Sequence, residues 1–176
     1  MNIRIVPGDA NDLLLSKVAG YPRKVRGVAF LDPYGMELCW DTLEALAQTK
    51  KLDIWYLFPL SGLYRLATKD PIHIDEIKRT AIDRILGTSE WYNALYRESR
   101  QPTLFAELER PERTDGDGLE RYVKDRLETV FARVAGPLRL PKDGPPRYSL
   151  FLGVSNPNPS VGKIATGIAD HILRHA

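Results

Sequence analysis

The amino-acid sequence predicts an α/β fold of the doubly wound, three-layer kind, with helices on both faces of a largely parallel sheet. Continuous apolar runs at residues 25–31, 52–58 and 148–154 have the length of buried strands. Segments whose apolar residues recur at helical spacing alternate with them, for example at residues 40–49. Strands that are apolar throughout and separated by helices are typical of parallel sheets covered on both faces.

The first half of the chain alternates strand and helix patterns. Ile3, Ile5 and Val6 predict a short strand that stops at Pro7, and Asp9 is placed to cap the helix that follows. Right-handed crossovers would bring the three strands of this half into one sheet. The expected strands lie at residues 3–6, 25–31 and 52–58, and the expected helices at 10–18 and 40–49.

The second half predicts a helical insertion at about residues 74–135, with helical spacing at 74–86 and 119–134. Residues 136–147 contain several Pro and Gly and indicate a linker. A strand at 148–154 and a helix at 161–175 end the chain. We expect a single α/β domain over residues 1–176, because this length is typical of one domain.

Composition bounds the function classes. The chain has 25 Lys and Arg against 23 Asp and Glu, so a net charge of +2 does not demand a nucleic-acid partner. Cys39 is the single cysteine, which excludes an intramolecular disulfide and a cysteine-built zinc site. The three histidines are too scattered to suggest a metal site. No apolar run approaches a membrane span, and the start lacks a secretory signal, so we expect a cytoplasmic protein without membrane contact.

The stretch Asp32-Pro33-Tyr34-Gly35 is the first candidate site, because it follows an expected strand. A carboxylate at the carboxyl end of a parallel strand faces the crevice in which open α/β sheets bind ligands. Pro33 fixes its own φ and restricts Asp32 to extended backbone, while Tyr34 adds a flat ring. These groups could hold a planar amino group. The alternative is a strand-ending turn with Pro second and Gly fourth.

Two further segments are expected at the same edge of the sheet. Gly8-Asp9-Ala10-Asn11 follows the first expected strand and could meet a purine edge, although Asp and Asn are also common helix caps. Phe58-Pro59-Leu60-Ser61-Gly62 follows the third and could form a wall of the crevice or only a turn. The shared edge is more informative than any one segment.

An aromatic and basic segment lies in the insertion. Trp91, Tyr92, Arg97 and Arg100 combine rings that can stack on bases with cations that can meet phosphate, a pattern that suits single-stranded nucleic acid. The alternative is a helix whose rings pack inward. The segment from Gly153 to Lys163 does not match a phosphate-binding loop. Its spacing is too long, and Ile164 stands where that motif needs a hydroxyl.

Several segments together resemble a known family. They are Val28–Gly35, Trp40–Ala47 and Leu52–Leu60, with Pro7–Asn11 and Tyr148–Leu152 in support. On these residues the chain resembles the three-Cys-motif partner proteins (TcmP), which are named for a neighbouring phage-type protein with three cysteines. The resemblance spans most of the chain and is strongest from Val28 to Leu60.

This resemblance implies a partial Rossmann-like fold of the class I methyltransferase type, with S-adenosylmethionine as cofactor and an amino group, of a nucleic-acid base, as target. Asp32, Pro33 and Tyr34 stand where methyltransferases acting on exocyclic amines carry their catalytic motif. Asp32 would then accept a hydrogen bond from the amine and Tyr34 would stack on the base. Asp9 and Ala10 would lie against the adenine of the cofactor.

The chain departs from this pattern at its start. The Gly-rich loop that holds the methionine part of the cofactor, and the acidic residue for its ribose, belong to strands that would precede those expected here. We therefore expect the C-terminal portion of a methyltransferase-like protein. The alternative is a catalytically inactive partner module of a phage- or defence-associated three-cysteine-motif protein. Unpaired sheet edges would also favour a homodimer.

Overall fold

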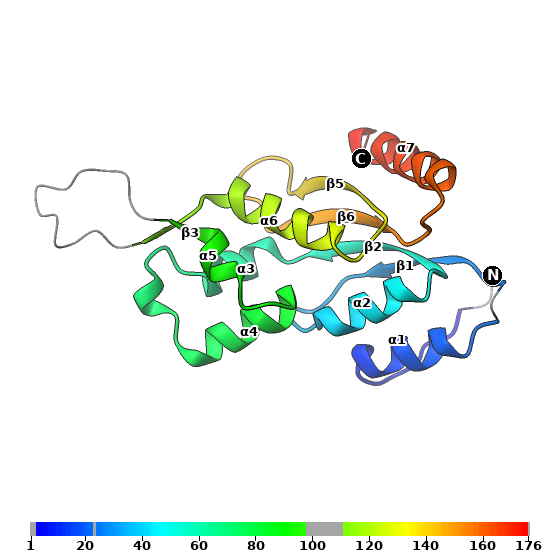
Figure 1. Ribbon diagram of the computed structural model, residues 1–176, viewed down its shortest axis with the longest axis horizontal. Helices are drawn as coiled ribbons and strands as arrows, with labels where there is room; N and C mark the ends of the chain where they lie inside the picture. The colour runs from blue at the N-terminus through cyan, green and yellow to red at the C-terminus, as the bar shows by residue number, and fades with distance from the viewer. Residues whose placement is uncertain (1–2, 23, 98–110, 176) are drawn as a thin grey trace, which may run out of the picture.

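The computed structural model describes residues 3–22, 24–97 and 111–175 and shows a mixed α/β fold around a four-stranded sheet (Figure 1). Strands β1 (Gly27–Leu31) and β2 (Leu52–Phe58) are parallel to each other. Strand β6 (Tyr148–Val154) lies antiparallel to β2, and β5 (Arg133–Leu140) lies antiparallel to β6. The order β1-β2-β6-β5 makes β1 and β5 the edges. The α/β class predicted from the sequence is confirmed, but the sheet is mixed rather than parallel.

The antiparallel half of the sheet follows from a short connection. Residues 141–147 alone join β5 to β6, whereas a parallel pair needs a crossover of a dozen or more residues. The helix expected over residues 119–134 is also shorter, because α6 (Gly116–Glu128) ends before β5 begins. Residues 136–140, expected as a linker, belong to β5. Pro137 is tolerated there because it lies on an edge strand, within the shift of register between Ala135 and Leu138.

One face of the sheet carries the main hydrophobic core. Every second residue of β2 points into it, and the helices α2 (Trp40–Gln48), α3 (Leu60–Leu66) and α6 pack against it. Helix α1 (Ala10–Ala19) packs on α2 rather than on the sheet. The segment between α3 and α6 contains η1 (Pro71–His73), α4 (Glu76–Leu86), α5 (Trp91–Leu95), and the two-residue strands β3 (Tyr96–Arg97) and β4 (Glu112–Arg113).

The opposite face is covered by a single described helix, α7 (Pro159–His175), which lies along β5 and β6. Its small residue Ala169 is buried in a second cluster with Ala135, Leu152 and Val154. In Figure 1 this helix lies on the other side of the strands from α1 and α2. The sheet is therefore enclosed between helices at the β5 side, while the β1 side of this face carries none of the described helices.

The prediction of a strand at Ile3, Ile5 and Val6 is wrong. These residues are exposed and belong to neither sheet. Alternating apolar residues form a strand only when another strand supplies backbone partners, and none lies beside this segment in the described chain. The expected cap is confirmed, because the carboxylate of Asp9 accepts hydrogen bonds from the first turn of α1.

Within the described residues, no helix has both the length and the apolar character needed to cross a membrane.

Candidate functional site

A cavity of about 460 Å³ lies at the carboxyl end of β1, next to the start of α1. It brings together two of the segments that the sequence places at one sheet edge. Its lining residues are Gly8, Asp9, Ala10, Asn11, Leu14, Phe30, Leu31, Asp32, Pro33, Tyr34, Glu37 and Leu38. Asp9, Ala10, Asp32, Pro33 and Tyr34, all proposed as site residues from the sequence, are therefore neighbours in space.

The Asp32 carboxylate is a polar group of this cavity with no partner among the described residues. It follows directly after β1, is exposed, and receives no hydrogen bond or ion pair from any residue that the structure describes. A carboxylate accepts hydrogen bonds only, and each oxygen can receive two. Asp32 is thus able to accept from the N–H groups of an amine that enters the cavity.

The turn after Asp32 gives the cavity a rigid side and an exposed ring. Pro33 restricts the backbone, and Gly35 has a φ of +59°, a conformation that suits a residue without a Cβ. Between them, Tyr34 is 94% exposed. The turn interpretation of these residues and the site interpretation are compatible, because the turn is what holds the carboxylate and the ring at the rim.

Polar side chains at the start of α1 fix this end of the helix to the loop that follows β1. Oδ1 of Asp9 accepts hydrogen bonds from the backbone N–H of Asn11 at 2.8 Å and of Asp12 at 3.3 Å. The Asn11 side chain donates to the carbonyl of Glu37 at 3.1 Å and accepts from Thr42 at 2.9 Å. The Asn11 bonds hold α1 against the loop that follows β1. Asp9 therefore caps the helix and lines the cavity at the same time.

The third segment expected at this edge does not contribute. Helix α3 begins at Leu60, immediately after β2, and buries Leu60 and Leu63 in the core. Ser61 donates its backbone N–H to the carbonyl of Arg147 at 2.9 Å. Neither Ser61 nor Gly62 lines the cavity, so this segment forms a helix start rather than a wall of the site.

Of the two aromatic residues proposed for stacking on bases, Trp91 is buried and Tyr92 is partly buried. Trp91 is 0% exposed, and its Nε1 donates to Asp83 at 2.5 Å. The Tyr92 ring stacks on Tyr96 with centroids 5.1 Å apart, and the Arg79 guanidinium lies over both Trp91 and Tyr92. The inward-packing alternative therefore describes Trp91, whose ring has no face left for a base. A buried indole and an exposed one have the same sequence pattern.

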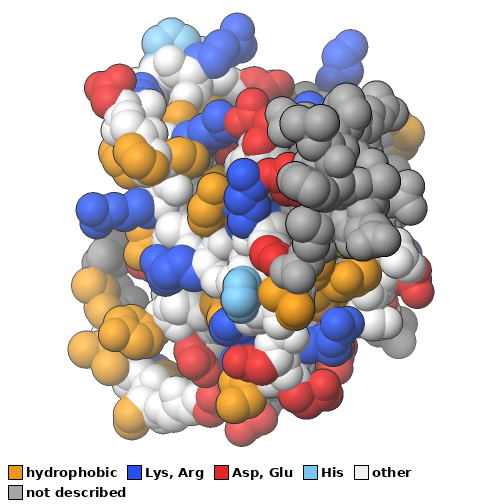
Figure 2. Space-filling model, turned by 90° about the vertical axis from the view of Figure 1, so that its left-hand side faces the viewer, with side chains coloured by type: hydrophobic (Ala, Val, Ile, Leu, Met, Phe, Trp, Pro, Cys, Tyr) orange, Lys and Arg blue, Asp and Glu red, His pale blue; other side chains and the backbone are white. Residues whose placement is uncertain are grey.

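The nucleic-acid role expected of the basic residues of that segment stays a prediction. The backbone of Arg97 lies in β3, and Arg100 lies outside the described residues. Arg113 is buried and donates to the carbonyls of Tyr64 and Ala67. Figure 2 shows the end of the molecule that carries α4, where acidic and basic side chains are interspersed over the coloured surface.

The sequence did not single out Phe30 or Glu37, which also line the cavity. Phe30 stands in a continuous apolar run and was expected to be buried, yet it is exposed because β1 is an edge strand. Together with Asp9 and Asp32, Glu37 makes the lining acidic, and none of the described residues that line the cavity is Lys, Arg or His. Among the described residues, no three His, Cys, Asp or Glu side chains are grouped to hold a metal ion.

An acidic cavity with exposed rings suits a flat ligand that donates hydrogen bonds or carries positive charge. Comparisons with family models, with curated proteins and with solved structures find no match. The chemistry of the cavity is therefore the basis for a functional assignment.

Proposed function

We propose that this cavity recognises an amino group on a planar ring. We propose further that the chain is a methyltransferase-like protein that depends on S-adenosylmethionine, as its sequence resemblance implies. The observation that carries the proposal is the free Asp32 carboxylate at the carboxyl end of β1, beside Pro33 and Tyr34 in one cavity. Ligands of open α/β sheets bind at this end of the strands. A nucleic-acid base with an exocyclic amine is the substrate that these groups would accommodate.

Each group would have a defined task. Asp32 accepts a hydrogen bond from the amine and fixes its orientation, and the carbonyl of Asp32 or Pro33 can accept the second N–H. Tyr34 and Phe30 offer flat faces at the rim. These roles position a substrate and need no change of charge on any protein group.

The fit to S-adenosylmethionine is incomplete. The apolar residues Ala10, Leu14 and Leu38 line the cavity and would suit the adenine. Among the described residues, no cationic side chain lines the cavity to meet the carboxylate of the methionine part. The residues described here therefore do not form a full cofactor site, and the proposal assigns them recognition of the amino group only.

The test compares two nucleosides that differ in the amine. We expect adenosine to shift the backbone amide NMR signals of residues 30–38, and inosine, which lacks the exocyclic amine, to bind more weakly. Asp32→Asn should weaken adenosine binding by about tenfold, because a hydrogen bond to a charged group contributes about 1.5–3 kcal/mol. Asp41→Asn, an exposed carboxylate on α2 outside the cavity, is the matched control. Equal binding of the two nucleosides, or unchanged binding by Asp32→Asn, would remove Asp32 from recognition.

A second candidate is the catalytically inactive partner module of a three-cysteine-motif protein. The lack of a cation for the cofactor carboxylate favours it. This function requires that the chain co-purifies with the three-cysteine protein and does not transfer a methyl group from S-adenosylmethionine. Methyl transfer that is lost in Asp32→Ala would instead establish the enzyme.

A further inference from the structure

The face of the sheet opposite the main core is only half covered. Val28 and Phe30 of β1 point to this face and are 66% and 60% exposed. The parallel register places Phe30 beside Trp55 of β2, which packs at the border of the cluster under α7. An apolar strip of sheet therefore begins where the cover provided by α7 ends.

Helix α7 has an apolar stripe that is largely exposed to solvent. Ile164, Ile168 and Ile172 recur every four residues and are 65%, 58% and 47% exposed. Thr166 and Asp170 lie on the flank of α7 that faces β5, where they line a cavity with residues 131–136. At 100° per residue the isoleucines lie on the opposite flank, so they are turned toward the β1 side of the sheet.

Helix α7 cannot move over this strip within its own chain. Its buried residues Gly162 and Ala169 pack tightly, and a Cβ at Gly162 would lie 2.6 Å from Cδ of Arg133 on β5. The helix is thus fixed over β5 and β6. The strip on β1 and the stripe on α7 are two exposed apolar surfaces of one chain that cannot cover each other.

The exposed apolar area is close to what a dimer interface needs. A standard interface buries about 800 Å² per partner, and the interfaces of homodimers are about 65% apolar, which requires about 520 Å² of apolar surface. The five side chains named above expose on the order of 500 Å², toward the upper end of the patches found on monomers.

We propose that a second copy of this chain covers this face, with the isoleucine stripe of each α7 packed on Val28 and Phe30 of the other copy. A two-fold axis forms both contacts at once, because an isologous interface pairs each surface with its complement on the partner. Each sheet would then carry helices across both faces. Since the helix stripe and the sheet strip are on the same chain, the second copy supplies a surface of the required shape and polarity.

The test is the oligomeric state of the full chain, measured by light scattering across a concentration series. We expect twice the monomer mass of 19.9 kDa. Val28→Glu and Ile168→Glu should each raise the dimer dissociation constant by at least about tenfold, because a charge would be buried in the interface. Ile77→Glu, at a still more exposed isoleucine on α4, is the control and should leave the dimer intact.

A mixing experiment distinguishes this arrangement from other dimers. Val28→Glu and Ile168→Lys chains should each be monomeric alone, yet form a mixed dimer that has one native contact and one Glu–Lys pair. Circular dichroism checks that each variant is folded. A wild-type monomer, a dimer that survives both Glu variants, or two variants that do not combine would overturn the proposal. All of these measurements are made without a ligand in the cavity, so the proposed function is tested separately.

Discussion

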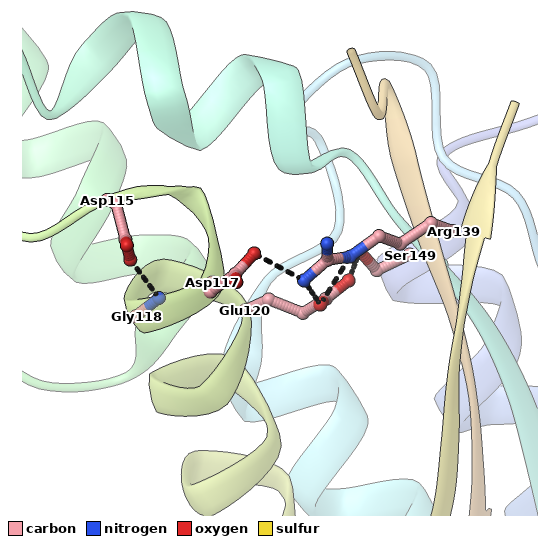
Figure 3. A network of polar contacts seen from close by, with 6 residues as sticks. All are labelled: Asp115, Asp117, Gly118, Glu120, Arg139 and Ser149. Carbon is pink, nitrogen blue, oxygen red and sulfur yellow. Dashed lines mark hydrogen bonds and ion pairs between the residues drawn. The ribbon is translucent and has the colours of Figure 1, made fainter. Parts of the chain in front are cut away.

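The carboxylate of Glu120 offers the sharpest test of how this fold is stabilised. Glu120 lies on α6, and its side chain is only 5% exposed (Figure 3). Its Oε2 accepts from Arg139 Nε at 2.8 Å and from Nη2 at 2.6 Å, while Oε1 accepts from the Ser149 hydroxyl at 2.5 Å. Arg139 is on β5 and Ser149 on β6, so one side chain joins α6 to both strands of the hairpin.

The expected cost of Glu120→Ala follows from what each partner loses. The Ser149 hydroxyl is fully buried and would be left without an acceptor, which costs about 1–3 kcal/mol. Arg139 would lose two charged hydrogen bonds but keep Asp117 at 2.7 Å, and its partly exposed guanidinium can reach water, so its loss is about 1 kcal/mol. Hydrogen bonding to Glu120 also raises the pKa of Arg139. We expect a total loss of about 3 kcal/mol, at the lower limit for breaking a buried pair.

Urea unfolding followed by circular dichroism measures this loss as a lower midpoint at an unchanged slope. Glu128→Ala removes an exposed carboxylate from the end of the same helix and should change stability by less than about 0.5 kcal/mol. A double-mutant cycle with Ser149→Ala should show coupling, since either single change breaks the same bond. If Glu120→Ala were no more destabilising than Glu128→Ala, the network would contribute nothing and this account of the hairpin would fail.

Two further changes test local features. Gly87 ends α4 with a φ of +65°, and a Cβ there would lie 2.0 Å from Cδ1 of the buried Trp40. Gly87→Ala should therefore lower the free energy of unfolding by about 3 kcal/mol through strain and overpacking, which thermal unfolding measures. Gly144→Ala, with positive φ but open space, should cost about 1–2 kcal/mol, and equal losses would mean that Trp40 yields freely. Burial raises the pKa of Tyr96 from 10.0 to about 12. Below pH 10 the hydroxyl keeps its proton in both the folded and the unfolded state, so the full contribution of Tyr96 to stability is present. Stability should then fall as the pH rises from 10 to about 12, because the unfolded state releases the proton first, and urea midpoints measured across that window should fall less steeply for Tyr96→Phe.

The sequence was a good guide to the elements that are stabilised by burial. The strand at Leu52–Phe58 and the helix that begins at Trp40 have the predicted bounds within a residue or two, because their apolar spacing reports directly on the core. Direction and pairing were not accessible in the same way. The apolar run of β6 has the same composition whether it lies parallel or antiparallel to β2, and the Pro-containing β5 resembles a linker until its edge position is known.

The candidate site was predicted in part for a related reason. Asp32 could be placed at the carboxyl end of its strand, where open α/β sheets bind ligands. Asp9 was expected beside it after a strand at residues 3–6 that does not form, and it reaches the cavity because α1 packs on α2. Trp91 could not be placed, since an aromatic residue near arginines has the same pattern in a core as on a binding surface. Phe30 was missed for the opposite reason, because exposure of an apolar residue depends on which strand forms the edge.

Phe30 connects the two proposals. It lines the cavity beside Asp32, and it also lies on the sheet face over which the α7 stripe of a second copy would pack. A helix placed on Phe30 would shield one wall of the cavity from water, which strengthens a hydrogen bond between Asp32 and an amine in the same cavity. Binding and dimerisation would then share one side chain, and each equilibrium would depend on the other by the same factor. An edge strand with exposed apolar residues is a liability in a monomer, whereas in this arrangement it would couple assembly to ligand recognition.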